Sequence, residues 1–296
     1  MDRLILLEFA DRMTNHKNDK VLVLGGTGKT GRRIAERLNR AARPIRIGTR
    51  SAETAFDWTD RGTWEPALRG ISAVYLAYAP DAGFPGAADT IGAFAALAVD
   101  SGVNRMVLLT GRGEEGAQRS ERLVQAAGAE WTVVRSSFFA QNFSEDFFAP
   151  AVAHGEVAFP AGNVGEPFID VEDIADVAFA ALTEDGHAGR TYEVTGPRLL
   201  TFAAAVAEIA AVIGSDIRYR PITSAEFLSS MVDQGVDAEF ATNLTALFDD
   251  VLDGRNSYLG DGVELALRRA PHDFSDFARR AAGEGAWNRS TAFALP

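Results

Sequence analysis

The fold of this chain is indicated most directly by VLVLGGTGKTGRR, from Val21 to Arg33. A short apolar run leads into a group of glycines, and a helical pattern of apolar residues follows, which is the order strand, phosphate loop, helix. Gly28-Lys29-Thr30 matches the end of the P-loop of ATP- and GTP-binding proteins. A P-loop also needs a glycine five positions before Gly28, and the chain has Val23 there. The stretch therefore does not predict an ATP site.

The glycines of the same stretch fit a dinucleotide-binding turn instead. Gly26, Gly28 and Gly31 give the G-x-G-x-x-G spacing, and Gly25, Gly28 and Gly31 give G-x-x-G-x-x-G. In such turns one glycine makes the tight bend, one lets a pyrophosphate approach the backbone, and one lets the helix pack on the strand. The helix N-terminus then stabilises the phosphate charge. The sequence predicts a dinucleotide cofactor.

Apolar runs alternate with amphipathic segments over the next hundred residues. This alternation, with strands that are apolar on both faces, predicts a parallel sheet covered by helices, hence an α/β, doubly wound Rossmann fold. The predicted strands cover residues 20–25, 44–50, 72–78, 105–111, 131–135 and 189–196, and the predicted helices 29–42, 86–102, 117–128 and 170–182. The helices over 86–102 and 117–128 are also candidate faces of a homodimer.

The last third of the chain has a different pattern. Predicted helices over 201–214, 223–235 and 237–253 precede a polar tail, so we expect a smaller, mostly helical cap on the substrate side. The predicted organisation is an N-terminal extension over 1–19, a Rossmann domain over 20–197, and the C-terminal cap with its tail over 198–296.

Composition excludes several classes of function. The net charge of −12 and the pI near 4.9 argue against nucleic acid as a partner. The chain has no cysteine, and its four histidines lack the spacing of metal ligands, so we expect neither thiol chemistry nor a metal. No apolar run approaches the about 18 residues of a membrane span, and the first residues are a poor signal peptide. The cytoplasm is the expected location.

The residue at the end of the second predicted strand indicates which dinucleotide binds. NAD enzymes carry an acidic residue there, which binds the 2′-hydroxyl of the ribose. This chain carries Arg50, whose positive charge suits a 2′-phosphate, and Lys29 lies within reach of the same region. The sequence therefore favours NADP(H) over NAD(H).

The lysines limit the chemistry. Short-chain reductases commonly donate a proton through a Tyr-x-x-x-Lys pair, and the only lysines here are Lys17, Lys20 and Lys29, none of them four residues after a tyrosine. Ordinary carbonyl reduction would need another proton donor, because an alkoxide forms as the hydride arrives. An iminium needs none, and a reduced quinone takes protons from water. The absence of the Tyr-x-x-x-Lys pair favours an intrinsically electrophilic acceptor, or a protein that catalyses no reaction.

Several segments resemble the ergot-alkaloid dehydrogenase-type family of NmrA-like atypical short-chain reductases. They are GGTGKTGRRIAERL, FDWTD, WTVVRSSFFAQNFSE, EPFIDVEDIADVAFAALTEDGHAGRTYEVTGP and VLDGRN. The likeness covers the chain from about Lys20 to about Arg280. It implies an NADPH-dependent oxidoreductase that transfers hydride to a small imine, iminium or quinone-like acceptor. The alternative is a non-catalytic NADP(H) sensor of the NmrA type.

The resemblance also implies roles for particular residues. Those expected to bind the pyrophosphate are Gly25, Thr27, Gly28, Lys29, Thr30 and Gly31, and Arg50 would bind the 2′-phosphate. Those expected around adenine, the ribose and the nicotinamide are Asp57, Trp58, Ala77, Tyr78, Ala79, Thr110, Ser137, Phe138 and Phe139. Gln141, Asn142 and Phe143 would begin the substrate wall. Asp170, Glu172 and Asp173 are interpreted as acids at a helix start rather than as a catalytic cluster.

Overall fold

The computed structural model describes residues 20–288, so the extension predicted over 1–19 lies outside the described residues. The described residues form two compact units. The first unit contains residues 20–110, 116–134 and 175–191, and the second contains 111–115, 135–174 and 192–288. Residues 135–174, which the sequence assigned to the Rossmann domain, therefore group with the C-terminal residues.

A six-stranded sheet organises the fold. In spatial order its strands are β2 (Ile45–Gly48), β1 (Val21–Leu24), β3 (Ala73–Leu76), β4 (Arg105–Gly111), β5 (Glu130–Ser136) and β7 (Arg190–Val194). Val21 pairs in parallel with Ile45 on one side and with Ala73 on the other. All residues of β1 and β3 are buried, which accounts for their continuous apolar runs. The predicted Rossmann-type parallel sheet is confirmed.

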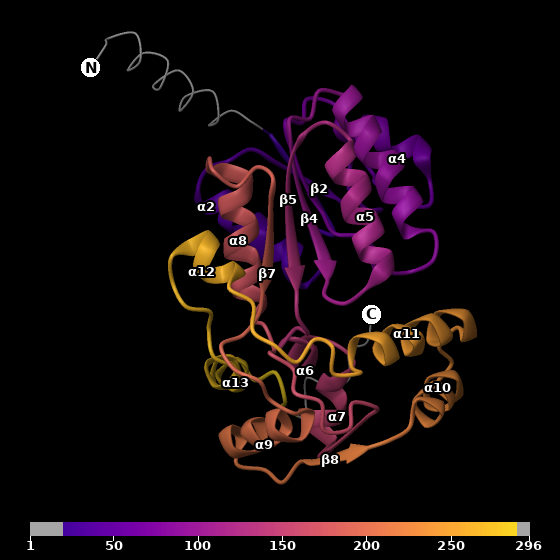
Figure 1. The fold of residues 1–296 in the computed structure, drawn as a ribbon, viewed down its shortest axis with the longest axis vertical. Helices are drawn as coiled ribbons and strands as arrows, with labels where there is room; N and C mark the ends of the chain where they lie inside the picture. The colour runs from indigo at the N-terminus through magenta and orange to yellow at the C-terminus, as the bar shows by residue number, and fades with distance from the viewer. Residues whose placement is uncertain (1–19, 289–296) are drawn as a thin grey trace. The chain divides into compact units, whose positions relative to one another are not determined.

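Helices cover both faces of this sheet. Figure 1 shows α4 (Ala87–Asp100) and α5 (Glu115–Ala126) on one side, and α2 (Lys29–Arg40) and α8 (Val171–Thr183) on the other. Within the first unit, Arg37 Nε donates to Asp176 Oδ1 at 2.7 Å and so links α2 to α8. The short η2 (Arg61–Thr63) and α3 (Trp64–Leu68) follow β2. The homodimer expected over α4 and α5 stays a prediction.

Helices are the main regular elements of the second unit. Its helices are α6 (Asn142–Glu145), α7 (Phe148–His154), α9 (Phe202–Ile213), α10 (Ser224–Asp233), α11 (Ala238–Val251), α12 (Gly262–Leu267) and α13 (Phe274–Gly283). It also contains a parallel pair of strands, β6 (Glu156–Phe159) and β8 (Arg218–Pro221), which the sequence did not predict because β8 is polar and largely exposed.

Two helices replace the expected polar tail. Within 254–288 the chain forms α12 and α13, and α13 buries Phe274, Phe277 and Ala278 on one face. The polar residues between these positions, Asp276 and Arg279 among them, obscured the helical spacing of the apolar ones.

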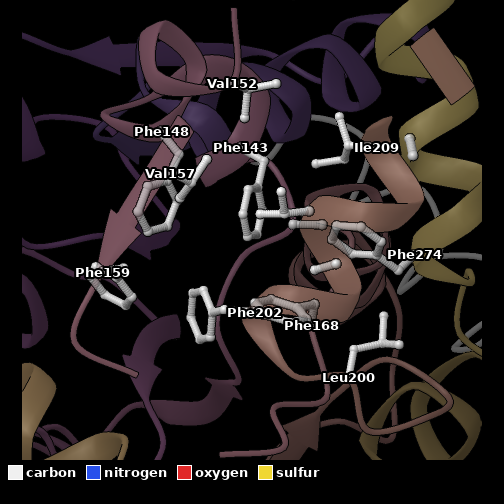
Figure 2. Close-up of a cluster of buried hydrophobic side chains, with 14 of the residues drawn as sticks. Phe143, Phe148, Val152, Val157, Phe159, Phe168, Leu200, Phe202, Ile209 and Phe274 are labelled. Atoms are coloured by element: carbon white, nitrogen blue, oxygen red, sulfur yellow. The ribbon is translucent and has the colours of Figure 1, made fainter. Parts of the chain in front are cut away.

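Phenylalanines form much of the core of the second unit. Figure 2 shows the rings of Phe143, Phe159, Phe168 and Phe202 gathered in this core. Phe202 lies 4.9 Å from Phe159 and 5.0 Å from Phe168, measured between ring centroids, and most of these rings meet edge to face or tilted. Such pairs contribute about 0.5–1.5 kcal/mol each beyond area burial, so the rings add to the stability of this unit.

No helix within residues 20–288 has the length and apolarity needed to cross a membrane. Over the same residues, no group of histidine and acidic side chains is arranged to hold a metal ion.

Candidate functional site

The phosphate loop has the geometry that its glycines require. Gly25 adopts a left-handed backbone with φ of 65°, and its carbonyl accepts a hydrogen bond from Gly28 N at 2.9 Å, which closes the turn. A Cβ on Gly31 would lie 2.2 Å from the Gly25 carbonyl oxygen, so only glycine lets α2 pack this closely on the turn. A Cβ on Gly26 would likewise come within 2.7 Å of Ile47.

This loop presents an anion-binding helix N-terminus. Gly28 is the N-cap of α2 and no side chain occupies the cap, and the first turn contains Lys29 and no acidic residue. Gly25, Thr27 and Gly28 are exposed, whereas Thr30 is buried beneath them. The helix dipole and a lysine both favour a phosphate at this position. The residues present therefore fit the pyrophosphate of a dinucleotide.

Arg50 and Asp57 lie near each other beyond β2. Arg50 is exposed just after the strand, and its positive charge helps to keep the pKa of Asp57 below the usual range. The larger causes of that lowered pKa are hydrogen bonds from the Thr59 backbone N–H and hydroxyl to Asp57 Oδ1, each at 2.8 Å. Asp57 is thus a fixed carboxylate, and Arg50 is available to an anionic ligand.

Trp58 and Tyr78, two of the residues that the resemblance places around the cofactor, lie close to each other. Their ring centroids are 5.0 Å apart with the planes tilted by 53°, and both side chains are only half-buried. Phe94 packs against Trp58 from the core at 5.3 Å. Ala77 lies next to the loop, because a Cβ on Gly25 would be 3.2 Å from that of Ala77. Ala79 follows on the surface, so this edge combines small residues with aromatic ones.

The side chain of Thr110 is held in a buried interaction. Its Oγ1 donates to Glu121 Oε1 at 2.8 Å, and both side chains are 3% exposed. Glu121 belongs to α5 and had no role in the prediction. The hydroxyl that the resemblance placed near the nicotinamide is therefore held by a carboxylate of the neighbouring helix.

The segment after β5 is tied to residues 166–169 of the second unit. Ser137 Oγ donates to the Pro167 carbonyl at 2.6 Å, and Phe139 forms a β-bridge with Ile169. The Phe138 ring packs into the aromatic core, 5.2 Å from that of Phe202. Phe138 is thus a packing residue of the second unit's core.

Two of the three residues expected in the substrate wall are buried within the second unit. Phe143 is fully buried and stacks on Phe148 at 4.9 Å, and Trp287 Nε1 donates to its carbonyl. Gln141 is 3% exposed: Nε2 donates to Asp170 Oδ1 at 2.7 Å, and Oε1 accepts from Val171 N at 2.9 Å. Of the three, only Asn142, which begins α6, is partly exposed.

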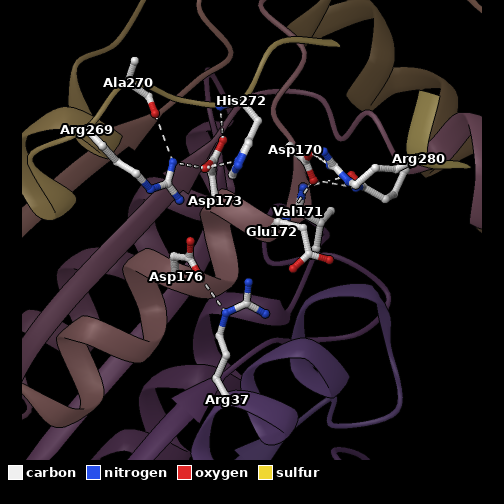
Figure 3. Close-up of polar contacts among 11 residues, drawn as sticks. Arg37, Asp170, Val171, Glu172, Asp173, Asp176, Arg269, Ala270, His272 and Arg280 are labelled. Atoms are coloured by element: carbon white, nitrogen blue, oxygen red, sulfur yellow. Dashed lines mark hydrogen bonds and ion pairs between the residues drawn. The ribbon is translucent and has the colours of Figure 1, made fainter. Parts of the chain in front are cut away.

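The acids at the start of α8 take separate roles. Asp170 caps the helix by accepting from Glu172 N at 3.0 Å, and it also pairs with Arg280. Asp173 instead accepts from Arg269 Nη1 at 2.6 Å and pairs with His272 Nδ1 at 2.7 Å, as Figure 3 shows. The interpretation as acids at a helix start is confirmed, because Asp170 directly precedes α8 and Glu172 and Asp173 lie in its first turn. Asp173 holds the segment between α12 and α13.

A buried polar pair in the second unit had no role in the prediction. Arg112 follows the last residue of β4 and is 3% exposed, as is Glu166. Burial raises the pKa of Glu166 to about 7, against the opposing effects of the Phe138 N–H and the Arg112 charge. The sequence carried a signal for each: Arg112 directly follows an apolar strand, and Glu166 is an isolated acid before the apolar run that starts at Pro167.

No protein-family model matches the chain. Festuclavine synthase I of Penicillium roqueforti is 31% identical over 280 residues, which cover 87% of this chain and 96% of that protein. The chain belongs to the ergot-alkaloid dehydrogenase-type family. An NAD(P)H azoreductase of Xenophilus azovorans is also 31% identical, over 296 residues that cover 90% of this chain and 99% of that protein.

The fold of this family member agrees with solved structures of reductases. The triphenylmethane reductase of Citrobacter sp., whose crystal structure is a complex with NADP(H), superposes with a TM-score of 0.70 at 18% identity. The match covers 89% of this chain and 99% of that chain. At this identity the match shows the shared fold.

Proposed function

We propose that this family member is an NADPH-dependent oxidoreductase that transfers hydride to a small electrophilic acceptor, of the imine, iminium or quinone type. The observation that carries the proposal is the phosphate loop: an uncapped, acid-free start of α2, with Gly31 packed on the Gly25 carbonyl. Relatives named as a festuclavine synthase and an azoreductase support the redox chemistry. The missing Tyr-x-x-x-Lys pair supports an acceptor that is already electrophilic.

The pyrophosphate is proposed to bind at the phosphate loop, through Gly25, Thr27, Gly28, Lys29, Thr30 and Gly31. Trp58 and Tyr78, whose rings lie 5.0 Å apart, are proposed to flank the adenosine. Arg50 is proposed to bind the 2′-phosphate, because it is exposed and its guanidinium can bind phosphate oxygens in pairs. A bound reduced nicotinamide would supply the hydride.

The choice of cofactor is tested by titrating NADPH and NADH into the wild-type protein and into Arg50→Ala. We expect the substitution to weaken NADPH binding by about ten- to a hundredfold, the usual effect of losing charge-assisted hydrogen bonds, and to leave NADH binding unchanged. Arg69→Ala is the matched control, since Arg69 is also exposed and its ion pair with Glu65 is long, at 3.8 Å. Equal losses for both cofactors would contradict the role of Arg50.

Turnover is tested by following the oxidation of NADPH with a panel of cyclic imines, quinones and azo compounds. Consumption with at least one class is expected. Tight NADPH binding without consumption of any acceptor would contradict the proposed reductase and favour the alternative, a redox sensor. A sensor must also bind NADP+ and NADPH with different affinities, because a ligand with equal affinity for both states shifts nothing.

A further inference from the structure

Arg112 is a buried cation with unused donors. Its Nη2 donates to the Tyr258 carbonyl at 3.1 Å, and its guanidinium carbon lies 4.1 Å from the centroid of the Tyr258 ring. Nε and Nη1 are buried, and neither has a hydrogen-bond partner among residues 20–288. Leaving buried charged donors unpaired is costly, which makes this guanidinium a ready binding group for oxygen atoms of a ligand.

Glu166 is the carboxyl group whose charge is coupled to Arg112. Its Oε1 accepts from Phe138 N at 3.0 Å, and burial raises its pKa to about 7 even though that hydrogen bond and the Arg112 charge both oppose the rise. Within the described part of the chain, Arg112 is the charged side chain that acts on Glu166. Near neutral pH a large fraction of Glu166 therefore carries a proton that it can donate.

Arg112 follows the end of a strand, and Glu166 is hydrogen-bonded to a residue that lies just beyond the end of another. Arg112 comes directly after Gly111 of β4, and its N–H donates to the Ser136 carbonyl at the end of β5. Glu166 is fixed to Phe138, two residues beyond the end of β5. Open α/β folds bind their ligands at the carboxyl ends of the strands, so the pair occupies the edge where an acceptor is expected.

We propose that Arg112 and Glu166 form the acceptor site for a group that becomes anionic when it receives hydride, a quinone above all: Arg112 Nε and Nη1 bind the developing oxyanion, and Glu166 donates its proton to the reduced acceptor. This inference rests on the proposed reductase function. It supplies the proton donor that the absent tyrosine and lysine leave open.

The step balances with the reduced nicotinamide as the only reductant. A quinone that receives the hydride gains two electrons, while the C4–H bond of the nicotinamide breaks and a bond from that hydrogen to the quinone forms. The anion left on oxygen takes the proton of Glu166, whose O–H bond breaks, and Glu166 remains as a carboxylate beside Arg112. Water then reprotonates Glu166. The sum is quinone, NADPH and one proton giving hydroquinone and NADP+.

An iminium acceptor provides an internal comparison. It is cationic before hydride transfer and becomes a neutral amine, so the step needs no proton from the protein. A substitution at Glu166 should therefore affect the two acceptor classes differently. A general loss of folding or of NADPH binding would affect both classes alike.

The decisive variant is Glu166→Gln, which keeps the acceptor for Phe138 N but has no acidic proton. With a quinone we expect kcat to fall by about a hundredfold at pH 6, within the usual contribution of a general acid, and the wild-type decline in kcat as pH rises through about 7 to disappear. With a cyclic iminium both variants should behave alike. Glu264→Gln, an exposed carboxylate of α12, is the matched control and should match the wild type throughout.

Arg112 is tested by binding as well as by rate. The probe is the anion of a hydroxynaphthoquinone, titrated by calorimetry in the presence of NADP+. We expect Arg112→Gln to weaken its binding by at least about tenfold, to raise KM for the neutral quinone, and to leave NADPH binding unchanged. Thermal unfolding of each variant shows whether it is folded. Arg112→Lys keeps the positive charge but lacks the planar pair of donors, so it should bind the anion with intermediate affinity.

A proton on Glu166 is detected without turnover. The infrared band of a protonated carboxyl group should be present in the wild type at pH 6, and absent both at pH 9 and in Glu166→Gln. The inference is overturned if the wild type reduces quinones while Glu166→Gln keeps the same pH profile, or if Arg112→Gln binds the anion as the wild type does. A wild type that binds NADPH and reduces no acceptor contradicts the proposed function instead, and this inference with it.

Discussion

Thr110 Oγ1 donates to Glu121 Oε1 at 2.8 Å, and both side chains are buried. The pair joins the end of β4 to the middle of α5 inside the first unit. A carboxylate in such a place is retained only with polar partners, so the two residues depend on each other.

Replacing Glu121 should show this dependence. We expect Glu121→Ala to lower the free energy of unfolding by about 2–4 kcal/mol, because it leaves a cavity and takes away the acceptor of the Thr110 hydroxyl. Glu121→Gln retains an acceptor oxygen of nearly the same shape and should cost clearly less. Chemical denaturation of both variants measures the difference; equal costs would mean that the hydrogen bond contributes nothing and only volume matters.

Gly31→Ala should damage the phosphate loop. The added Cβ would lie 2.2 Å from the Gly25 carbonyl oxygen and 2.8 Å from Gly26 Cα, which are backbone atoms that cannot rotate away. We expect a loss of about 1–3 kcal/mol of stability from the forced shift and a weakening of NADPH binding by about tenfold or more, measured by denaturation and by titration.

The matched control is Gly283→Ala, where a Cβ meets nothing within 4 Å at the end of α13. This variant should be as stable as the wild type or slightly more stable, since alanine favours a helix. Normal NADPH affinity in Gly31→Ala would show that the tight approach of α2 to the turn is not needed for binding.

Gln141→Glu should loosen the start of α8. The wild-type amide donates to Asp170 Oδ1 and accepts from Val171 N, so it holds the first turn at two points. The carboxylate of the variant can still accept from Val171 N. It has no N–H to donate to Asp170, and the two carboxylates repel each other. We expect a loss of about 2 kcal/mol or more at pH 7, a smaller loss at about pH 4, and preserved NADPH affinity. A variant as stable as the wild type at both pH values would contradict this positioning role.

Glu166 should make stability depend on pH in a defined direction. Its pKa is about 7 in the folded chain, above the ordinary 4.5, so the folded state holds the proton more tightly than the unfolded state. The contribution of Glu166 to stability is therefore complete below about pH 4.5 and is lost as pH rises to about 7, a change of about 3 kcal/mol at most.

The Glu166→Gln variant cannot titrate at this position. As pH rises from about 5 to about 8, the free energy of unfolding of the variant should increase relative to that of the wild type, measured by urea denaturation at each pH. A constant difference between the two proteins across this range would show that Glu166 titrates normally.

Local patterns predicted the sheet and the loop well. The apolar runs matched β1, β3 and β4 to within two residues at each end, because buried parallel strands are apolar on both faces. The glycine spacing located the turn before α2, since only glycine tolerates the approach to the Gly25 carbonyl. Strand β8 escaped prediction because RYRP carries no apolar alternation. Helix α13 was missed because its apolar face is spaced among charged residues.

The sequence alone determined four features of this protein. They are the order of strands and helices along the chain, the dinucleotide turn, the arginine after β2 and the absence of a tyrosine–lysine pair. Each of these depends on residues adjacent in the chain or on composition. Other properties became visible in the tertiary structure alone. They are the burial of Phe143 and Gln141, the hydrogen bond from Thr110 to Glu121, and the burial of both Arg112 and Glu166 in the second unit. Those properties arise from partners far apart in the chain, and burial is what changes the chemistry of a carboxyl group or a guanidinium.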